Sequence, residues 1–248
     1  MEIFLIGLAT LVGTLSQTVT GFGFVFFLLP AMLAYQSPQV AVTTILLIGL
    51  TLNLLILAER RRTEILGRVA VTITLAALPG ILLGAFILRV IAKEPLQILV
   101  GALIIAAAGV QLLKRTGPRL EAKGGLGLAV CGFIAGTMNS ATSMGGPALA
   151  LWMRGRRLTV NEVRDTLAAC FLVLNVAGIL AIQTVGAGSL DGRGLVLFAV
   201  LTPVIVLGHL AGRRLGAHMS TRAYRFVFVT LIITAGLVSI GLGTHFLG

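Results

Sequence analysis

Apolar runs of about 20 residues, the length that a helix needs to cross the hydrocarbon core of a bilayer, recur along this chain. Short basic loops separate them. Hydrophobic residues make up 57% of the 248-residue chain and charged residues 11%, whereas a soluble domain carries roughly a quarter charged residues. The sequence therefore predicts an all-α, polytopic membrane protein. It argues against a soluble globule, a disordered chain or a disulfide-stapled secreted module.

The formal net charge of +11 is also compatible with nucleic-acid binding. The basic residues, however, lie in loops next to apolar spans, where they set membrane orientation and contact anionic lipid head groups. We therefore expect the lipid bilayer, and no nucleic acid, as a partner. Cys131 and Cys170, the two cysteines, both lie in apolar segments and make neither a disulfide framework nor a metal cluster.

Two apolar segments, residues 3–35 and 126–153, are longer than a single crossing needs. Small and polar residues interrupt each of them near its middle, at 16–23 and at 139–147. Each segment is therefore either one long kinked helix or a helical hairpin that returns to its starting face. The other apolar segments are predicted to cross once each: 38–58, 69–88, 96–113, 166–185, 195–212 and 226–247.

The Lys and Arg residues of the loops distinguish these two alternatives, because cytoplasmic loops collect positive charge. If both interrupted segments cross once, the two sides of the membrane carry nine and ten basic residues, which is no bias. If both are hairpins, one side carries 16 and the other carries three. The sequence therefore predicts two hairpins, with both chain termini outside.

The two halves of the chain resemble each other at a shift of 122 to 124 residues. The stretch 17–20 matches 139–142, and the Leu-Asn pair that contains Asn53 recurs at Asn175. At a slightly larger shift, three further matches follow: Pro79 with Pro203, Gly84 with Gly208 and Arg89 with Arg213.

Each half then consists of one hairpin and three crossings, so the second half enters the membrane from the opposite face. This predicts two inverted-topology repeats, a transporter plan in which substrate binds near the midplane where interrupted helices meet. The predicted division is 1–113 for the first repeat, 114–125 for a basic cytoplasmic linker and 126–248 for the second repeat.

The two interruptions are the candidate substrate site. Backbone polar groups cannot remain unpaired in hydrocarbon, so irregular chain at membrane depth must line a cavity or pack inside protein. The half-helices that follow, 24–35 and 147–153, would direct their N-termini inward, where free N–H groups and the helix dipole attract an anion. Hydroxyl and amide side chains would add donors, and glycines would let a ligand approach the backbone. The candidate residues of the interruptions are Gln17, Thr18, Thr20, Gly21, Gly23, Asn139, Ser140, Thr142, Ser143, Gly145 and Gly146.

A structural explanation exists for the same residues, since small residues allow close helix packing and Ser and Thr can bond back to their own helix. The recurrence of the interruptions in both halves favours a binding role. Asn53 and Asn175, well inside apolar spans, are either further substrate ligands or hydrogen bonds between helices. His209, the one titratable side chain well inside a predicted crossing, is either a proton-coupling site or a packing residue.

Signatures of other functions are missing from the sequence. No acidic residue lies in the middle of a predicted span, which leaves a cation pump or a di-acid metal site unsupported. A Walker A pattern, a zinc signature and a nucleophile with catalytic spacing are also absent. The sequence predicts that the protein is not an enzyme, with no catalytic residue, no metal and no cofactor.

The stretch 136–147, GTMNSATSMGGP, followed by LAACFLVLN at 167–175, resembles the sulfite exporter TauE/SafE family of membrane transporters. Through the doubled arrangement the likeness covers nearly the whole chain. The resemblance implies transport of small sulfur-containing anions, such as sulfite or organosulfonates, across the bacterial inner membrane, often outward. The residues by themselves lead only as far as a small anion.

The leading hypothesis is a secondary transporter whose two repeats rock around a central anion site. A passive anion channel with the same architecture is the alternative. A membrane-embedded enzyme is a third hypothesis, for which the sequence supplies no nucleophile or metal set. The oligomeric state stays open, a homo-oligomer included.

Overall fold

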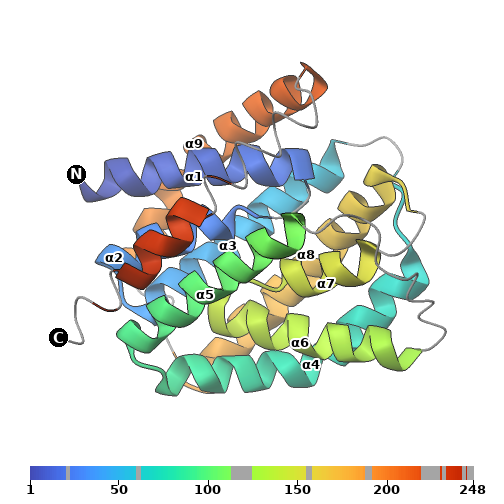
Figure 1. Ribbon diagram of the computed structural model, residues 1–248, viewed down its shortest axis with the longest axis horizontal. Helices are drawn as coiled ribbons and strands as arrows, with labels where there is room; N and C mark the ends of the chain where they lie inside the picture. Colours follow the sequence, from blue (N-terminus) through green and yellow to red (C-terminus); the bar gives the residue numbers. More distant parts are fainter. Residues whose placement is uncertain are drawn as a thin grey trace.

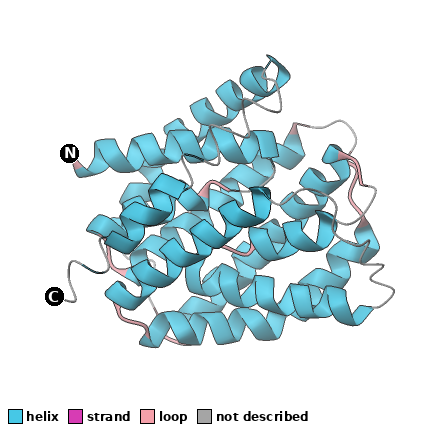
Figure 2. Ribbon diagram, viewed as in Figure 1, coloured by secondary structure: helices cyan, strands magenta, loops and turns pink. Residues whose placement is uncertain are grey.

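Helices form all the regular structure in the described part of the chain (Figures 1 and 2). The computed structural model describes residues 1–20, 23–59, 63–112, 125–154, 158–187, 192–218, 230, 233–241 and 244. Most of the predicted linker and half of the predicted last crossing lie outside these residues. The helices are α1 (Glu2–Thr20), α2 (Val25–Tyr35), α3 (Pro38–Ala58), α4 (Gly67–Val90), α5 (Lys93–Leu112), α6 (Gly125–Thr142), α7 (Gly146–Arg154), α8 (Val160–Thr184) and α9 (Gly192–His218), and residues 233–241 are also helical.

The predicted crossings coincide with helices, although some helices begin earlier than the apolar pattern does. The helix α3 covers 38–58 as predicted, whereas α8 begins at Val160 rather than at residue 166. A capping box explains the early start. Thr159 Oγ1 accepts a hydrogen bond from the Glu162 backbone N–H at 3.0 Å, and the Glu162 carboxylate accepts one from the Thr159 N–H at 2.7 Å. The cap therefore extends α8 by a polar first turn that the apolar pattern does not include.

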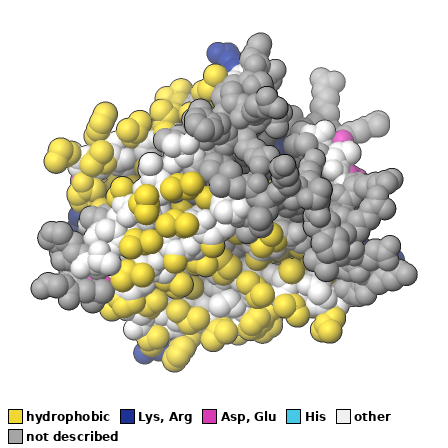
Figure 3. Space-filling view, in the orientation of Figure 1, with side chains coloured by type: hydrophobic (Ala, Val, Ile, Leu, Met, Phe, Trp, Pro, Cys, Tyr) yellow, Lys and Arg dark blue, Asp and Glu magenta, His cyan; other side chains and the backbone are white. Residues whose placement is uncertain are grey.

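Five described helices are long and apolar enough to cross a bilayer by length and composition: α3, α4, α6, α8 and α9. Their outward faces carry large apolar side chains, such as Leu75 and Phe86 of α4, which are exposed. Hydrophobic side chains spread over the described part of the face in Figure 3, and the Lys and Arg atoms lie at its edges. Soluble monomers rarely expose continuous apolar surface of this extent. The chain is therefore a multi-pass membrane protein.

The first interrupted segment folds back on itself as a hairpin of α1 and α2. The returning backbone lies so close to α1 that a Cβ placed on Gly13 would be 2.7 Å from the Phe24 carbonyl oxygen. At the other end of the hairpin, the Gln36 side-chain amide donates a hydrogen bond to the Glu2 carboxylate. The start of α1 and the end of α2 therefore lie side by side, although the two arms have 19 and 11 residues.

Two basic loops meet at one end of the molecule. The loop between α3 and α4 packs on the first turns of α8 through two hydrogen bonds of 3.0 Å, from Glu64 N–H to Asp165 Oδ2 and from Leu66 N–H to Thr166 Oγ1. If both interrupted segments crossed once, these two loops would lie on opposite sides of the membrane. Their contact agrees with the hairpin alternative.

The weakly basic loops meet at the opposite end. Arg89, at the end of α4, donates a hydrogen bond of 2.9 Å to the carbonyl of Val185, the residue after α8. Arg193, at the start of α9, lies 3.7 Å from the Glu2 carboxylate. The N-terminal end of the chain therefore lies on the side that carries few basic residues.

Glycines bring α4 and α6 into backbone contact, and the two helices run side by side in Figure 1. A Cβ on Gly80 would be 2.2 Å from the Phe133 carbonyl oxygen, and a Cβ on Gly84 would be 2.2 Å from that of Thr137. On the other side of the contact, a Cβ on Gly136 would be 2.3 Å from the Ala77 carbonyl oxygen. Small residues four apart on each helix are the pattern by which membrane helices approach closely.

We expect Gly84→Ala to lower the free energy of unfolding of the purified protein in detergent by about 1–3 kcal/mol, because the added methyl overpacks the contact. The melting temperature is expected to fall accordingly. Gly109→Ala is the matched control, since nothing lies within 4 Å of a Cβ at that helical position. Equal melting temperatures for the two variants would contradict the α4–α6 contact.

Candidate functional site

The first helix break is built around Gly23. This residue has φ of 114°, a conformation that side-chain-bearing residues rarely adopt. The helix α2 begins two residues later, and no side chain caps its first turn. Residues 25–30 and 32–33 of α2 are all buried, so this short helix lies inside the protein rather than in lipid.

The second helix break is built around Ser143, a left-handed residue with φ of 57°. Its backbone N–H bonds to the Asn139 carbonyl at 2.8 Å, which closes the last turn of α6. The chain then folds back so tightly that a Cβ on Gly145 would be 2.7 Å from the Ala135 carbonyl oxygen. The helix α7 begins at Gly146, with Pro147 in its first turn, a position where proline costs no backbone hydrogen bond.

Both breaks open onto one cavity of about 30 Å³. The first turns of α2 and α7 line it from the two hairpins, and α3 and α8 supply the remaining walls. Two helix N-termini thus lie at one space, and each contributes the positive end of a helix dipole. The lining residues are Gln17, Gly23, Phe24, Val25, Phe26, Ile45, Leu46, Asn53, Asn139, Ser143, Met144, Gly146, Pro147, Phe171 and Asn175.

Two amide pairs form the polar part of the cavity wall. Gln17 Nε2 donates to Asn53 Oδ1 at 3.4 Å, and Asn139 Nδ2 donates to Asn175 Oδ1 at 3.2 Å. All four side chains are buried, with exposed fractions of 4% or less. Each pair joins the first arm of a hairpin to the crossing that follows it. The residues that the sequence aligned between the halves therefore make equivalent contacts.

The geometry of the pairs leaves hydrogen-bond donors at the cavity. Asn53 and Asn175 use their side-chain oxygens as acceptors, so their Nδ2 groups remain available to a further partner. A Cβ on Gly49 would be 2.7 Å from Asn175 Nδ2, so only glycine leaves room for this side chain. Amide donors and helix N-termini around an apolar pocket are suited to an anion that accepts several hydrogen bonds.

Four of the candidate residues do not line this cavity. Thr18 Oγ1 bonds to the Thr14 carbonyl at 2.8 Å and contacts His209, and Thr142 Oγ1 bonds back to the Met138 carbonyl at 2.8 Å. Ser140 and Gly145 are buried beside the cavity: Ser140 Oγ is 3.3 Å from a Cβ built on Gly178, and Gly145 lies under α6. Gly21 and the side chain of Thr20 lie outside the described residues.

Sequence reasoning missed the apolar lining, above all Phe24, Phe26 and Phe171. Helical periodicity is the signal that could have found Phe171, which lies one turn before Asn175 on the same face of α8. Leu46 precedes Asn53 on one face of α3 in the same manner, at a spacing of two turns. The wall of the cavity is therefore mainly apolar, which the polar residues alone do not indicate.

Metal-binding clusters are absent from the described residues, where no group of three or more His, Cys, Asp and Glu side chains could hold a metal ion. Cys131 and Cys170 are free thiols on α6 and α8. The candidate site therefore consists of amides, one hydroxyl, backbone and apolar side chains.

The fold and the cavity define an integral membrane protein with a small cavity between two helix breaks, lined by apolar side chains and two amide pairs. Comparison with known sequences identifies the family: the model of the family "Sulfite exporter TauE/SafE" matches residues 5–239. The chain belongs to the TauE/SafE family of transporters. It is 26% identical over 238 residues to the protein described as "Probable sulfite/organosulfonate exporter TauE" from Cupriavidus necator, with 94% of this chain and 92% of that protein covered. No solved structure matches the chain significantly.

The Asn139–Asn175 hydrogen bond can be tested by a double-mutant cycle with Asn139→Ala and Asn175→Ala. Hydrogen bonds between membrane helices contribute about 0.6–2 kcal/mol, so we expect a coupling energy in this range in thermal unfolding. The matched cycle combines Asn139→Ala with Gln39→Ala, because Gln39 bonds to the Leu88 carbonyl and not to the pair. Strict additivity in both cycles would mean that the pair does not interact.

Proposed function

We propose that this protein is a secondary transporter that moves a small sulfur-containing anion, sulfite or an organosulfonate, outward across the bacterial inner membrane. The observation that carries the proposal is the cavity, where two helix N-termini and two buried amide pairs converge. Membership of a sulfite exporter family supports the sulfur-containing substrate. The anionic substrate follows from the donors, because this polar wall contains no charged side chain that would favour a cation.

We further propose that the chain consists of two inverted repeats, 1–113 and 126–248. The equivalent amide pairs support this division, since Gln17–Asn53 and Asn139–Asn175 have the same separation of 36 residues. The packing supports it as well, because α4 lies along α6 and α9 lies along α1. Each hairpin is thus held by the second crossing of the other half.

The basic residues support a cytoplasmic position for the end where the α3–α4 loop meets α8. On the hairpin topology this side carries 16 Lys and Arg residues and the other side carries three. The start of α1 lies at the other end, beside Arg193. We therefore propose that both termini lie outside.

Alternating access accounts for the size of the cavity better than a passive channel does. A volume of 30 Å³ holds about two water molecules, which is room for a single small oxyanion rather than for a row of hydrated ions. A channel would need a continuous path of that width. Movement of the two hairpins against α3 and α8 would open the cavity to each side in turn.

Transport can be measured with purified protein in liposomes and radiolabelled sulfite or isethionate. We expect saturable exchange, with trans-stimulation by unlabelled anion on the opposite side. Replacing the amide donor in Asn139→Ala is expected to reduce exchange by tenfold or more, on the order of one or two hydrogen bonds to a charged ligand. Gln39→Ala removes a half-buried amide away from the cavity and is expected to retain exchange.

Two results would contradict the proposal. Full exchange activity in the Asn139→Ala and Asn175→Ala proteins would refute the assignment of the substrate site to the cavity. Flux that neither saturates nor responds to unlabelled anion would indicate a channel instead of a transporter.

A further inference from the structure

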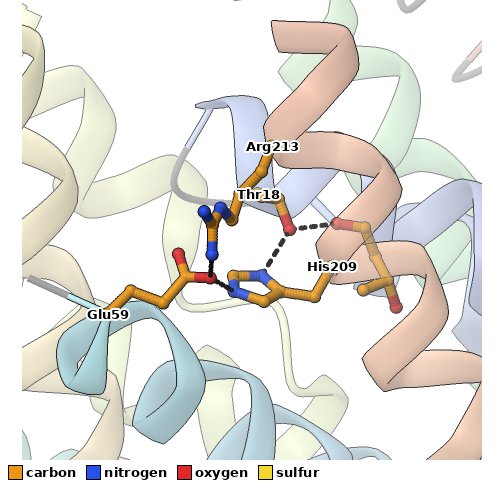
Figure 4. Close-up of polar contacts among 5 residues, drawn as sticks. Thr18, Glu59, His209 and Arg213 are labelled. Atoms are coloured by element: carbon orange, nitrogen blue, oxygen red, sulfur yellow. Dashed lines mark hydrogen bonds and ion pairs between the residues drawn. The ribbon is translucent and has the colours of Figure 1, made fainter.

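A second polar cluster lies between α1, α3 and α9, outside the lining of the cavity (Figure 4). His209 of α9 is 2% exposed, and its ring lies between Glu59 at the end of α3 and Thr18 of α1. Its Nε2 is 2.9 Å from Glu59 Oε1, and its Nδ1 is 3.0 Å from Thr18 Oγ1. Arg213, one turn further along α9, lies 2.6 Å from the same carboxylate oxygen.

The hydrogen-bond donors of this cluster restrict where its protons can be. Glu59 and Arg213 form an ion pair, so an Nε2 lone pair would face a carboxylate, and Nε2 therefore carries a hydrogen. Thr18 has one hydroxyl hydrogen and two acceptors within reach, the Thr14 carbonyl at 2.8 Å and His209 Nδ1 at 3.0 Å. A carbonyl can only accept, so the state of Nδ1 decides the direction of the Thr18 hydroxyl.

Two arrangements satisfy every group, and they differ by one proton. With neutral His209, the Thr18 hydroxyl donates its hydrogen bond to Nδ1 and no longer donates one to the Thr14 carbonyl. With a proton bound at Nδ1, the ring donates to Thr18 Oγ1, and the Thr18 hydroxyl then donates to the Thr14 carbonyl. Binding of the proton therefore changes the hydrogen bonding of α1 itself.

The same helices connect this cluster to the cavity. Thr18 follows Gln17 on α1, and Glu59 follows Asn53 at the end of α3. The Gln17–Asn53 hydrogen bond joins α1 to α3 directly, and the contacts of His209 with Thr18 and Glu59 join the same two helices nearby. A change at either site acts on the relative position of α1 and α3.

The cluster has no counterpart in the other half of the chain. The repeat shift aligns His209 with Ala85 and Thr18 with Ser140, whose hydroxyl finds no hydrogen-bond partner among the described residues. A buried titratable group within a membrane helix is costly and is typically functional. A cluster needed only for helix packing would be expected in both halves.

We propose that the Glu59–His209 pair is the proton-binding site that couples transport to a pH gradient, with the exchangeable proton on His209 Nδ1. The proposal rests on the proposed transport function. The charged groups that face the ring are Glu59 of α3, Arg213 of α9 and Arg164 of α8, and α1 contributes only the Thr18 hydroxyl. The bound proton adds one positive charge to a balanced Glu59–Arg213 pair. Proton and anion are linked because both act through α1 and α3.

The test compares exchange with gradient-driven uptake in proteoliposomes, using radiolabelled sulfite and isethionate. Exchange at equal pH on both sides reports the transport function alone. A gradient of one pH unit supports about tenfold accumulation when one proton is coupled to each anion, and the sign that drives uptake gives the direction of coupling. Sulfite itself titrates near neutral pH, so the comparison between wild-type protein and variants carries the result.

We expect His209→Gln and Glu59→Gln to retain exchange and to lose the gradient-driven accumulation. Thr18→Val is expected to weaken the accumulation and Thr18→Ser to restore it, because serine keeps the hydroxyl. Glu2→Gln is the matched control, since Glu2, like Glu59, is a carboxylate paired with an arginine of α9, but it lies on α1 at the other end of the molecule. This variant is expected to respond to the gradient like the wild-type protein.

Gradient-driven accumulation in folded His209→Gln and Glu59→Gln proteins would overturn the proposal. Wild-type exchange that no pH gradient drives would also overturn it and would leave the transport function intact. Loss of exchange in both variants, with an unchanged melting temperature in detergent, would assign the cluster to translocation rather than to proton coupling. Absence of exchange in the wild-type protein would refute the transport function instead.

Discussion

Hydrocarbon offers no hydrogen-bond partner, so each backbone N–H and C=O at membrane depth has to be paired inside the protein. Two helices of this chain end within the apolar segments, and the backbone turns at Gly23 and Ser143, which both have positive φ. At each break the chain folds back against the helix that precedes it, and residues of α3 and α8 complete the wall around the two breaks. The cavity lies where the two breaks meet, and the first turns of α2 and α7 form part of its wall.

The helices around the two hairpins pack more closely on one side of the molecule than on the other. Glycines at 80, 84 and 136 let α4 and α6 touch backbone to backbone, whereas α9 meets α1 through Gly208 and Gly212 against threonine side chains. The two contacts are equivalent in position and differ in closeness. The polar cluster of His209 lies beside this looser α1–α9 contact. Its side chains need space between α1, α3 and α9.

The two halves therefore share a framework and differ in chemistry. Both have a break, an amide pair and an arginine that reaches a helix end, Arg89 at Val185 and Arg213 at Glu59. Only the second half places a histidine on the helix that holds the opposite hairpin. In the proposed transporter, the repeated framework would provide access from two sides, and the histidine, present in one half, would link that access to a single proton.

The sequence by itself determined that the chain is a helical membrane protein of the TauE/SafE family, and it located both helix breaks. Length and hydropathy report these properties directly, because the bilayer imposes its thickness on each span and small polar residues in an apolar run mark where a helix ends. The sequence also drew attention to Gln17, Asn53, Asn139 and Asn175, which form two hydrogen-bonded pairs in the structure, since a buried amide needs a partner wherever it lies. Only the tertiary structure decided that Thr18 faces His209 rather than the cavity and that Glu59 approaches a histidine 150 positions away in sequence. Those outcomes depend on the rotation of each helix about its axis, which is set by packing against neighbours and leaves no trace in local periodicity.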